Sequence, residues 1–215
     1  MGEEQALNLR LSSVTKRLGG FLLGPVDLAL EGGEYVAVVG PNGAGKTTLL
    51  YLISGFMQPD AGDIYMGGRR VNGSPPEERR AAFVFSEPVL FPNMSVAENL
   101  EFAARGNPGR LHDVRRALGI DRLEGRRAWE LSTGQARRVE MARALLSEPS
   151  FLLMDEPYSA IDPSDRGAVA AYMKGYASAT GTAVLLTTHH MEDTERADRV
   201  LSMAGGRLEA PRQRL

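Results

Sequence analysis

The chain has 215 residues, a size that suits one globular domain better than two. Its 25 lysines and arginines are offset by 27 aspartates and glutamates, and the resulting formal net charge of −2 argues against a nucleic-acid partner. The chain has no cysteine, so disulfides, zinc–thiolate sites, iron–sulfur clusters and thiol nucleophiles are excluded.

The sequence also lacks the features of a membrane-spanning or secreted chain. No apolar run reaches the roughly 18–20 residues that span a bilayer. The acidic N-terminal segment MGEEQALNLR has no apolar region of the kind found in secretory signals. We therefore expect a cytoplasmic location, with any role at a membrane supplied through a partner.

The first third of the chain predicts strands around one helix. Apolar and polar residues alternate over 7–14 and 26–30, a pattern typical of half-buried strands. The short apolar run at 35–40 predicts a strand buried on both faces. It enters a glycine-rich turn and then a segment with the apolar spacing of a helix, within 40–56. Residues 58–71 predict a turn, a short strand and a glycine turn.

The rest of the chain alternates between strands and helices. Strands are predicted at 81–85, 150–155 and 182–188, and a helix is predicted over 167–179. Such alternation predicts a largely parallel α/β sheet. Residues 98–143 have a helical composition with three arginine pairs, and we expect these to lie on solvated faces. The pairs are Arg115/Arg116, Arg126/Arg127 and Arg137/Arg138.

The segment at 40–47 fits the pattern G-x-x-x-x-G-K-[ST], which wraps the phosphates of a nucleotide. Its glycines let several N–H groups face phosphate oxygens, and the start of the next helix adds positive potential. Lys46 supplies a compact charge for the β- and γ-phosphates, and the Thr47 hydroxyl is suited to Mg²⁺. The glycine spacing does not fit a dinucleotide-binding loop. The predicted nucleotide-binding residues are Gly40, Pro41, Asn42, Gly43, Ala44, Gly45, Lys46, Thr47 and Thr48.

Two acids stand at the end of the predicted strand 150–155. Asp155 can hold Mg²⁺, directly or through water, beside the phosphate loop. Glu156 can act as general base toward the attacking water. The alternative is a solvated acidic pair with no chemical role, an interpretation that the neighbouring phosphate loop disfavours.

A third motif is Leu-Ser-Thr-Gly-Gln at 131–135, which is followed by ARRVEMARALLSEP. Here the sequence resembles the ATP-binding subunits of ABC transporters, whose signature reads LSGGQ. The order of the motifs also matches: phosphate loop, signature, acidic pair, Ser159–Asp162 and then Thr188-His189. The resemblance extends from about Leu7 to Leu208.

This resemblance implies a fold and a cycle. The fold is a single domain over 1–215: a P-loop NTPase core with a mainly parallel sheet, an N-terminal antiparallel β subdomain and an inserted α-helical subdomain at about 93–145. The cofactors are ATP and Mg²⁺. A second copy, or a homologous ATPase subunit, is expected head-to-tail around two ATPs. The signature residues then face the partner's ATP: Leu131, Ser132, Thr133, Gly134 and Gln135.

The resemblance also assigns individual roles. Glu156 and Lys46 are expected to be catalytic, together with His189, which matches the histidine that holds the γ-phosphate and the water. His189 and His190 fall on opposite sides if the strand continues through them. Asp162 matches an aspartate that communicates across the dimer, although capping of the helix at Pro163 is an alternative role for it.

Two positions depart from the family pattern. Ser86 stands where the family usually has a glutamine that contacts Mg²⁺ or water, and its short side chain weakens that metal assignment; adjacent Glu87 is a weaker substitute. We expect the loop to couple nucleotide state to a partner less tightly than usual. Leu18 stands where an aromatic residue usually stacks on adenine. Phe21 lies three residues on, so we expect loose adenine specificity.

The segment LFPNMSVAENLEF resembles the part of import subunits that faces the membrane proteins. Phe91, Pro92, Met94 and Val96 are candidates for an apolar groove that receives a short helix; internal packing is the alternative. Transmembrane permease subunits are thus expected partners, with the chain peripheral on the cytoplasmic face. A substrate-binding protein is a further candidate, and import is favoured slightly over export.

Other functions known for a phosphate-loop core fit this sequence less well. Soluble ABC-type ATPases of DNA repair or chromosome organisation carry coiled coils or large insertions before the signature, for which the 45 positions from Ser86 to Leu131 leave no room. A weakly hydrolytic, nucleotide-gated binding module is kept open by Ser86. A small-molecule kinase would explain the phosphate loop but not the signature.

Overall fold

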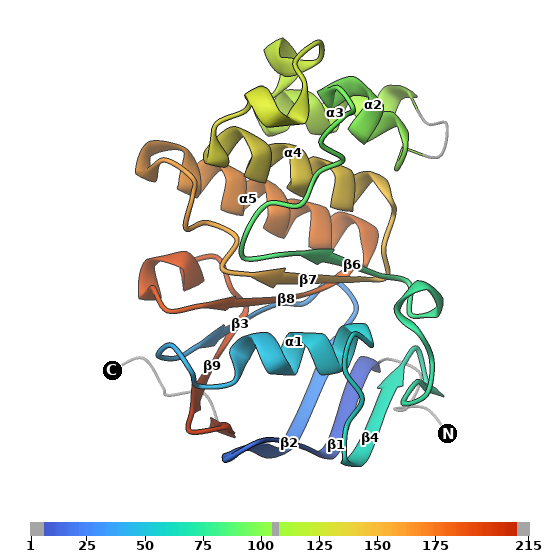
Figure 1. The fold of residues 1–215 in the computed structure, drawn as a ribbon, viewed down its shortest axis with the longest axis vertical. Helices are drawn as coiled ribbons and strands as arrows, with labels where there is room; N and C mark the ends of the chain where they lie inside the picture. The colour runs from blue at the N-terminus through green and yellow to red at the C-terminus, as the bar shows by residue number, and fades with distance from the viewer. Residues whose placement is uncertain (1–6, 105–107, 210–215) are drawn as a thin grey trace.

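The computed structural model describes residues 7–104 and 108–209, which form two sheets and the helices packed on them (Figure 1). The larger sheet has the strand order β10-β9-β3-β8-β7-β6, with parallel pairing except at the β10 edge. Every residue of β7 and β8 is buried, as expected for strands covered on both faces. Its strands are β3 (Tyr35–Val39), β6 (Ala81–Val84), β7 (Phe151–Asp155), β8 (Ala183–Thr188), β9 (Arg199–Ala204) and β10 (Arg207–Glu209).

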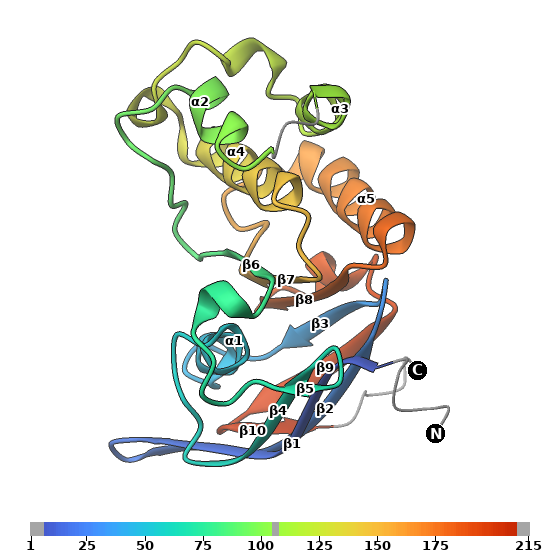
Figure 2. The same ribbon diagram turned by 90° about the vertical axis from the view of Figure 1, so that its right-hand side faces the viewer.

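The smaller sheet is antiparallel and has the order β2-β1-β4-β5. Helix α1 (Lys46–Ser54) lies between the two sheets (Figure 2). Val36 and Val38 of β3 pack there with Leu49 of α1 and Leu11 of β1. The strands of this sheet are β1 (Leu7–Leu18), β2 (Phe21–Glu31), β4 (Ala61–Met66) and β5 (Arg69–Arg70).

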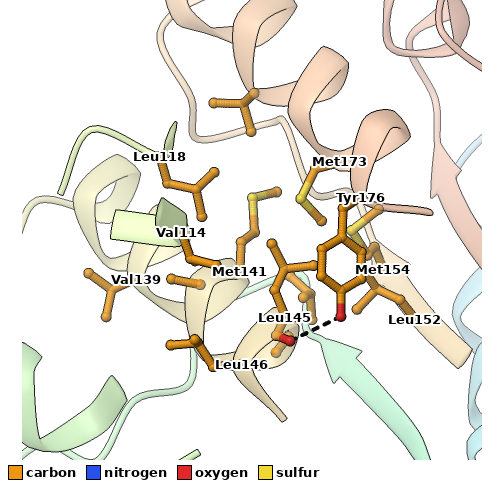
Figure 3. Close-up of a cluster of buried hydrophobic side chains, with 14 of the residues drawn as sticks. Val114, Leu118, Val139, Met141, Leu145, Leu146, Leu152, Met154, Met173 and Tyr176 are labelled. Carbon is orange, nitrogen blue, oxygen red and sulfur yellow. Dashed lines mark hydrogen bonds between the residues drawn. The ribbon is translucent and has the colours of Figure 1, made fainter. Parts of the chain in front are cut away.

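The other face of the larger sheet is covered by helices. Alternate residues of β3, Tyr35 and Ala37, point to this second core, because successive side chains of a strand face opposite sides. Figure 3 shows side chains from α3, α4, α5 and β7 meeting there, with the Tyr176 hydroxyl donating to the Leu145 carbonyl at 3.0 Å. The helices are α2 (Val96–Glu101), α3 (Pro108–Ala117), α4 (Thr133–Leu146) and α5 (Pro163–Thr180), with 3₁₀ turns at Pro76–Glu78, Asp121–Leu123, Ala128–Glu130 and Met191–Thr194.

This architecture confirms the predicted fold class: a mainly parallel core, an antiparallel β subdomain near the N-terminus and a helical region after β6. Helices α2, α3 and α4 fall in the region expected to form a helical subdomain, but its limits at 93–145 remain a prediction. Within 7–104 and 108–209, no helix combines the length and apolar character needed to cross a membrane. Residues 1–6 of the N-terminal segment judged above lie outside the described residues.

The expectation that all three arginine pairs are solvated is wrong for Arg137. Its side chain is 0% exposed and forms an ion pair with Glu140, which is 1% exposed, at 2.7 Å. The neighbouring Arg138 is 21% exposed and pairs with Asp165 at 3.5 Å. Arg137 faces the loop that follows β6, whose backbone carbonyls accept its hydrogen bonds, and this long-range partner is invisible in the local charge pattern.

Candidate functional site

The phosphate loop connects β3 to α1, and glycines give it its shape. Gly43 and Gly45 have φ of 77° and 103°, in the left-handed region that glycine tolerates. At Gly40 a Cβ atom would lie 2.1 Å from the Met203 carbonyl oxygen, so only glycine fits beside β9. The loop opens on a cavity of about 240 Å³ whose lining runs from Asn42 to Thr48 and includes Phe21 and Glu156.

Lys46 is held over this loop. Its Nζ donates to the carbonyls of Gly40 at 2.8 Å and Pro41 at 3.1 Å, and the residue is 6% exposed. These contacts fix the ammonium at the start of α1, where the positive end of the helix also points. The position therefore suits the oxygens of a phosphate chain.

The hydroxyl and carboxylate expected to bind metal lie in contact. Thr47 Oγ1 donates to Asp155 Oδ2 at 2.7 Å, across the gap between α1 and β7. Thr187 Oγ1 donates to Asp155 Oδ1 at 2.6 Å from the adjacent strand β8. Asp155 is 3% exposed, and these two hydroxyls fix its rotamer. Oxygen donors of this kind are the ligands that Mg²⁺ prefers, so Thr47 and Asp155 fit the metal.

Glu156 follows directly and adopts an unusual backbone conformation. Its φ of 48° lies in the left-handed region, which costs a non-glycine residue about 1–3 kcal/mol. Its amide donates to the Thr187 carbonyl at 2.9 Å, which holds the turn in place. As a result the Glu156 side chain lines the phosphate-loop cavity. Strain of this kind gathers at functional sites.

His189 contacts Glu156 directly. The Nδ1 atom of His189 lies 2.9 Å from Glu156 Oε1. A carboxylate can only accept, so in this pair Nδ1 carries the proton and Nε2 faces away from Glu156. The strand β8 ends at Thr188, so the two histidines do not alternate across it; their rings are in contact, with centroids 3.9 Å apart and planes tilted by 42°. His189 therefore lies beside the acidic pair, and its contact with the γ-phosphate stays a prediction.

The signature begins a helix on the opposite face of the large sheet. Ser132 is the N-cap of α4: its Oγ accepts from the Gln135 amide at 3.2 Å, and the Ser132 amide donates to Gln135 Oε1 at 3.1 Å. A Cβ on Gly134 would lie 2.6 Å from the Ala160 carbonyl oxygen, so glycine is required there as well. Ser132 and Thr133 are exposed at this helix start.

The structure does not bring the signature to the phosphate loop of its own chain. Helices α1 and α4 cover opposite faces of the larger sheet (Figure 1). None of the residues 131–135 lines the phosphate-loop cavity. A site that uses both motifs at once therefore needs them from two chains.

Asp162 sits at the N-cap position of α5, just before Pro163. Its carbonyl accepts from the amides of Asp165 and Arg166, but its side chain makes no capping hydrogen bond. The preceding Ser159 donates from Oγ to the Glu156 carbonyl at 3.0 Å. The segment thus starts at Glu156, and Ala160 within it lies beside Gly134.

The two departures from the family pattern lie at different places. Ser86 is exposed, and its carbonyl, rather than its side chain, is held by the Arg137 guanidinium. Leu18 is 39% exposed and pairs with Phe21 across the β1–β2 hairpin. A Cβ on Gly45 would lie 3.0 Å from Phe21 Cζ, and Phe21, unlike Leu18, lines the phosphate-loop cavity. The geometry favours Phe21 over Leu18 as the base-contacting residue.

Sequence reasoning missed Thr187 as a site residue. It forms the register pair of Asp155 on the adjacent parallel strand, and both strands end at the same sheet edge. A polar residue ending a neighbouring apolar strand was the signal that could have found it. It also missed Arg137 and Glu140, for which no local signal exists.

The comparisons with known proteins agree with this geometry. The family described as "ABC transporter" matches residues 23–159. The chain is 39% identical to the sulfate/thiosulfate import ATP-binding protein of Chromobacterium violaceum, over 94% of this chain and 57% of that protein. It is 38% identical to the molybdate/tungstate import ATP-binding protein of Thermococcus kodakarensis, over 93% of this chain and 63% of that protein. The chain thus spans about three-fifths of these relatives.

Solved structures are similar over nearly their whole length. The ATP binding subunit of an ABC transporter has a TM-score of 0.84 at 29% identity, covering 94% of this chain and 88% of that one. A dimeric ATP-binding cassette in a post-hydrolysis state, bound to ADP and Pi, has a TM-score of 0.83 at 28% identity, covering 96% of this chain and 100% of that one.

Proposed function

Because the chain belongs to the ABC transporter family, we propose that it is an ATP-binding and ATP-hydrolysing subunit that drives transport through separate membrane subunits. The observation that carries the proposal is the contact of Glu156 with His189, beside the Asp155–Thr47 pair at the phosphate loop. These groups have the chemistry that phosphoryl transfer needs, namely positioning of a nucleophile and neutralisation of charge.

Each residue then has a distinct task. The amides of the loop and Lys46 hold the phosphates of ATP, and Mg²⁺ held by Thr47 and Asp155 supplies charge neutralisation on them. Glu156 accepts the proton of the attacking water. His189 is oriented by Glu156 through Nδ1; to hold a γ-phosphate oxygen as well, its Nε2 must also carry a proton, so that both ring nitrogens donate. Phe21 gives adenine an apolar ring, which is tolerant of other bases.

We infer that the working unit is a head-to-tail pair, either two copies or this chain with a homologous ATPase subunit. The separation of the signature from its own phosphate loop supports this assembly. Ser132 and the start of α4 offer a hydroxyl and a positive helix end to the partner's γ-phosphate. The dimeric cassette with ADP and Pi is a precedent for such a pair. Asp162 is proposed to contact the partner across the same interface.

The coupling surface to the membrane subunits is proposed at a hollow of about 340 Å³ beside α2 and α4. Phe91 and Phe102 line it with ring centroids 5.0 Å apart, and Phe102 is 69% exposed. Of the residues expected in this groove, Phe91 lines the hollow, whereas Pro92 and Met94 do not. Val96 is 0% exposed and belongs to the core, so its assignment to the groove is wrong. The exposed rings suit the apolar face of a short helix from a permease subunit.

The direction and substrate follow from the relatives alone. The similar proteins carry names for import of sulfate or thiosulfate, molybdate or tungstate and, at 39% identity in Nitratidesulfovibrio vulgaris, spermidine or putrescine. We propose import, with a substrate-binding protein as a further partner and a location at the cytoplasmic face of the membrane. The substrates in these names differ in charge and size, so the relatives do not indicate one substrate for this chain.

Release of phosphate from ATP by the purified chain, with Mg²⁺ and without any phosphate acceptor, tests the proposal. We expect steady hydrolysis that rises more than linearly with protein concentration, because two chains build each site. Replacement of Lys46 by alanine serves as the inactive control. Turnover only with an added acceptor would indicate a kinase, and binding without turnover would indicate a nucleotide-gated binding module. If purified permease subunits did not change the rate of ATP hydrolysis, an ATPase uncoupled from transport would be favoured.

A further inference from the structure

The loop after β6 is built unlike any other part of the site. Residues 85–94 form neither helix nor strand, so their backbone N–H and C=O groups need partners from elsewhere. Two side chains of α4 supply four of these partners. Arg137 donates to the carbonyls of Phe85 and Ser86, and Glu140 Oε1 accepts from the amides of Phe85 at 3.4 Å and Val89 at 3.1 Å.

The two side chains also bind each other. Arg137 Nη1 donates to Glu140 Oε2 at 2.7 Å, one turn of helix away, and both residues are essentially without solvent exposure. We call Arg137 and Glu140 the clamp. Arg143, one turn further along α4, extends it by donating to the Val89 carbonyl at 2.5 Å and stacking over the Phe91 ring at 5.1 Å.

Stability alone is a poor explanation for the clamp. Removing two charges from water is costly, and apolar residues of similar volume in place of a buried ion pair are often neutral or stabilising. Burial raises the pKa of the Glu140 carboxyl despite the neighbouring guanidinium, which reflects that desolvation cost. What an apolar pair cannot supply is the set of hydrogen bonds to the loop backbone.

The clamp links two functional segments. Arg137 lies five positions after Ser132, on the same helix that begins with the signature. Ser86 lies near the start of the loop that the clamp holds. Phe91, which lines the proposed docking hollow, lies just after the end of that loop. Ser86 is exposed and its side chain is too short to reach far, so the loop has little direct hold on a nucleotide.

We propose that Arg137 and Glu140 are positioning residues that make the loop at 85–89 move with helix α4. The inference rests on the proposed function, in which Ser132 at the start of α4 meets the partner's γ-phosphate. ATP binding then shifts α4, and the clamp transmits that shift to the docking hollow. Coupling runs through the backbone of the loop and not through the side chain at position 86. This replaces the expectation of weak coupling with coupling by another route.

The test removes the clamp without unbalancing the buried charge. The variant R137M/E140L replaces both residues by apolar ones of similar size, and R138M is the matched control one position away, on the half-exposed side of α4. Both are placed in an E156Q background that holds ATP without turnover. Hydrogen exchange is then measured by mass spectrometry on peptides covering 85–89 and 131–137, with and without Mg²⁺ and ATP.

In the E156Q chain and in its R138M control, ATP is expected to slow exchange in both segments together. With R137M/E140L, exchange at 85–89 should be about tenfold faster or more in the absence of ATP, since local protection depends on those hydrogen bonds. ATP should still slow exchange at 131–137, but no longer at 85–89. In the Glu156 background, turnover should fall several-fold with KM for ATP unchanged.

Wild-type exchange and a wild-type ATP response at 85–89 in folded R137M/E140L would overturn the proposal. If that variant does not fold, Arg137→Lys keeps the charge beside Glu140 but cannot reach both carbonyls, and unchanged exchange at 85–89 in Arg137→Lys would overturn it equally. Absence of any ATP response in the chain with an intact clamp would count against the proposed function instead. The two failures are therefore distinguishable.

Discussion

The loops that leave β6 and β7 start side by side at one edge of the sheet, yet they are held in opposite ways. The β7 loop is fixed by short side chains and by its own backbone: Thr47 and Thr187 hold Asp155, and Glu156 turns with a φ of 48°. The β6 loop is fixed by the long side chains of Arg137 and Glu140, which reach it from α4.

This difference agrees with the function proposed for each loop. Chemistry needs a carboxylate fixed within a few tenths of an ångström, and short side chains bonded to rigid strands provide that fixity. A loop that reports on another element has to stay attached to that element when it moves. Long side chains from α4 attach the β6 loop to α4.

The largest expected effect concerns the β7 loop. Glu156→Gln keeps the shape of the side chain but removes the base, and it should lower kcat for ATP hydrolysis by about 10²–10⁴. ATP binding should persist. Glu87→Gln, an exposed acid on the β6 loop, is the matched control and should retain turnover. If Glu87→Gln abolishes turnover and Glu156→Gln does not, the general base lies on the β6 loop and its assignment to Glu156 is wrong.

The next effect concerns the β6 loop. Glu140→Ala leaves Arg137 buried without its counter-charge and frees two loop amides, so the free energy of unfolding should fall by about 3–5 kcal/mol. Urea unfolding measures it. Arg138→Ala removes a half-exposed pair on the same helix and should cost no more than about 1 kcal/mol. Equal losses in the two variants would show that Arg137 and Glu140 have no special hold on the loop.

A smaller effect should separate rigidity from catalysis at the β7 loop. Thr187→Val keeps the shape of the buried side chain and removes the donor to Asp155 Oδ1. The expected loss is about 1–3 kcal/mol of unfolding free energy, together with weaker Mg²⁺ dependence of turnover, because the carboxylate is held from one side only. Ser178→Ala, which removes an exposed hydroxyl on α5, is the control. An unchanged Mg²⁺ titration in Thr187→Val would contradict the idea that this hydroxyl positions Asp155.

The smallest effect belongs to an ion pair on the surface. Lys16 and the Arg17 amide donate to the Asp60 carboxylate, and these hydrogen bonds lower the pKa of Asp60. The folded pKa lies below the unfolded one, so the contribution is present above the ordinary aspartate pKa and is lost as pH falls through the lowered value. Asp60→Asn should slightly flatten the acid limb of the stability curve. An unaltered acid limb would show that the exposed pair contributes nothing.

Much of the candidate site could be predicted from the sequence because its residues fall in short, contiguous motifs. The phosphate loop needs glycines at fixed spacing, and Gly43 and Gly45 adopt the left-handed conformations that favour glycine. Asp155 and Glu156 follow an apolar strand, and His189 follows another, so the parallel sheet brings them to one edge. The ends of the core strands were likewise predictable from periodicity, whereas the helix expected over 167–179 begins earlier, at Pro163.

The tertiary structure decided what depends on neighbours distant in sequence. Arg137 and Arg138 are adjacent and chemically identical, but only Arg137 faces a loop about fifty residues earlier in the chain. Phe21, not Leu18, meets the phosphate loop because the hairpin register turns its ring toward Gly45. The signature and the phosphate loop lie on opposite faces of the larger sheet, and that separation is a property of the tertiary structure. The residue types of a short motif identify its chemistry, whereas the burial of a side chain and the identity of its partners depend on the packing of distant segments.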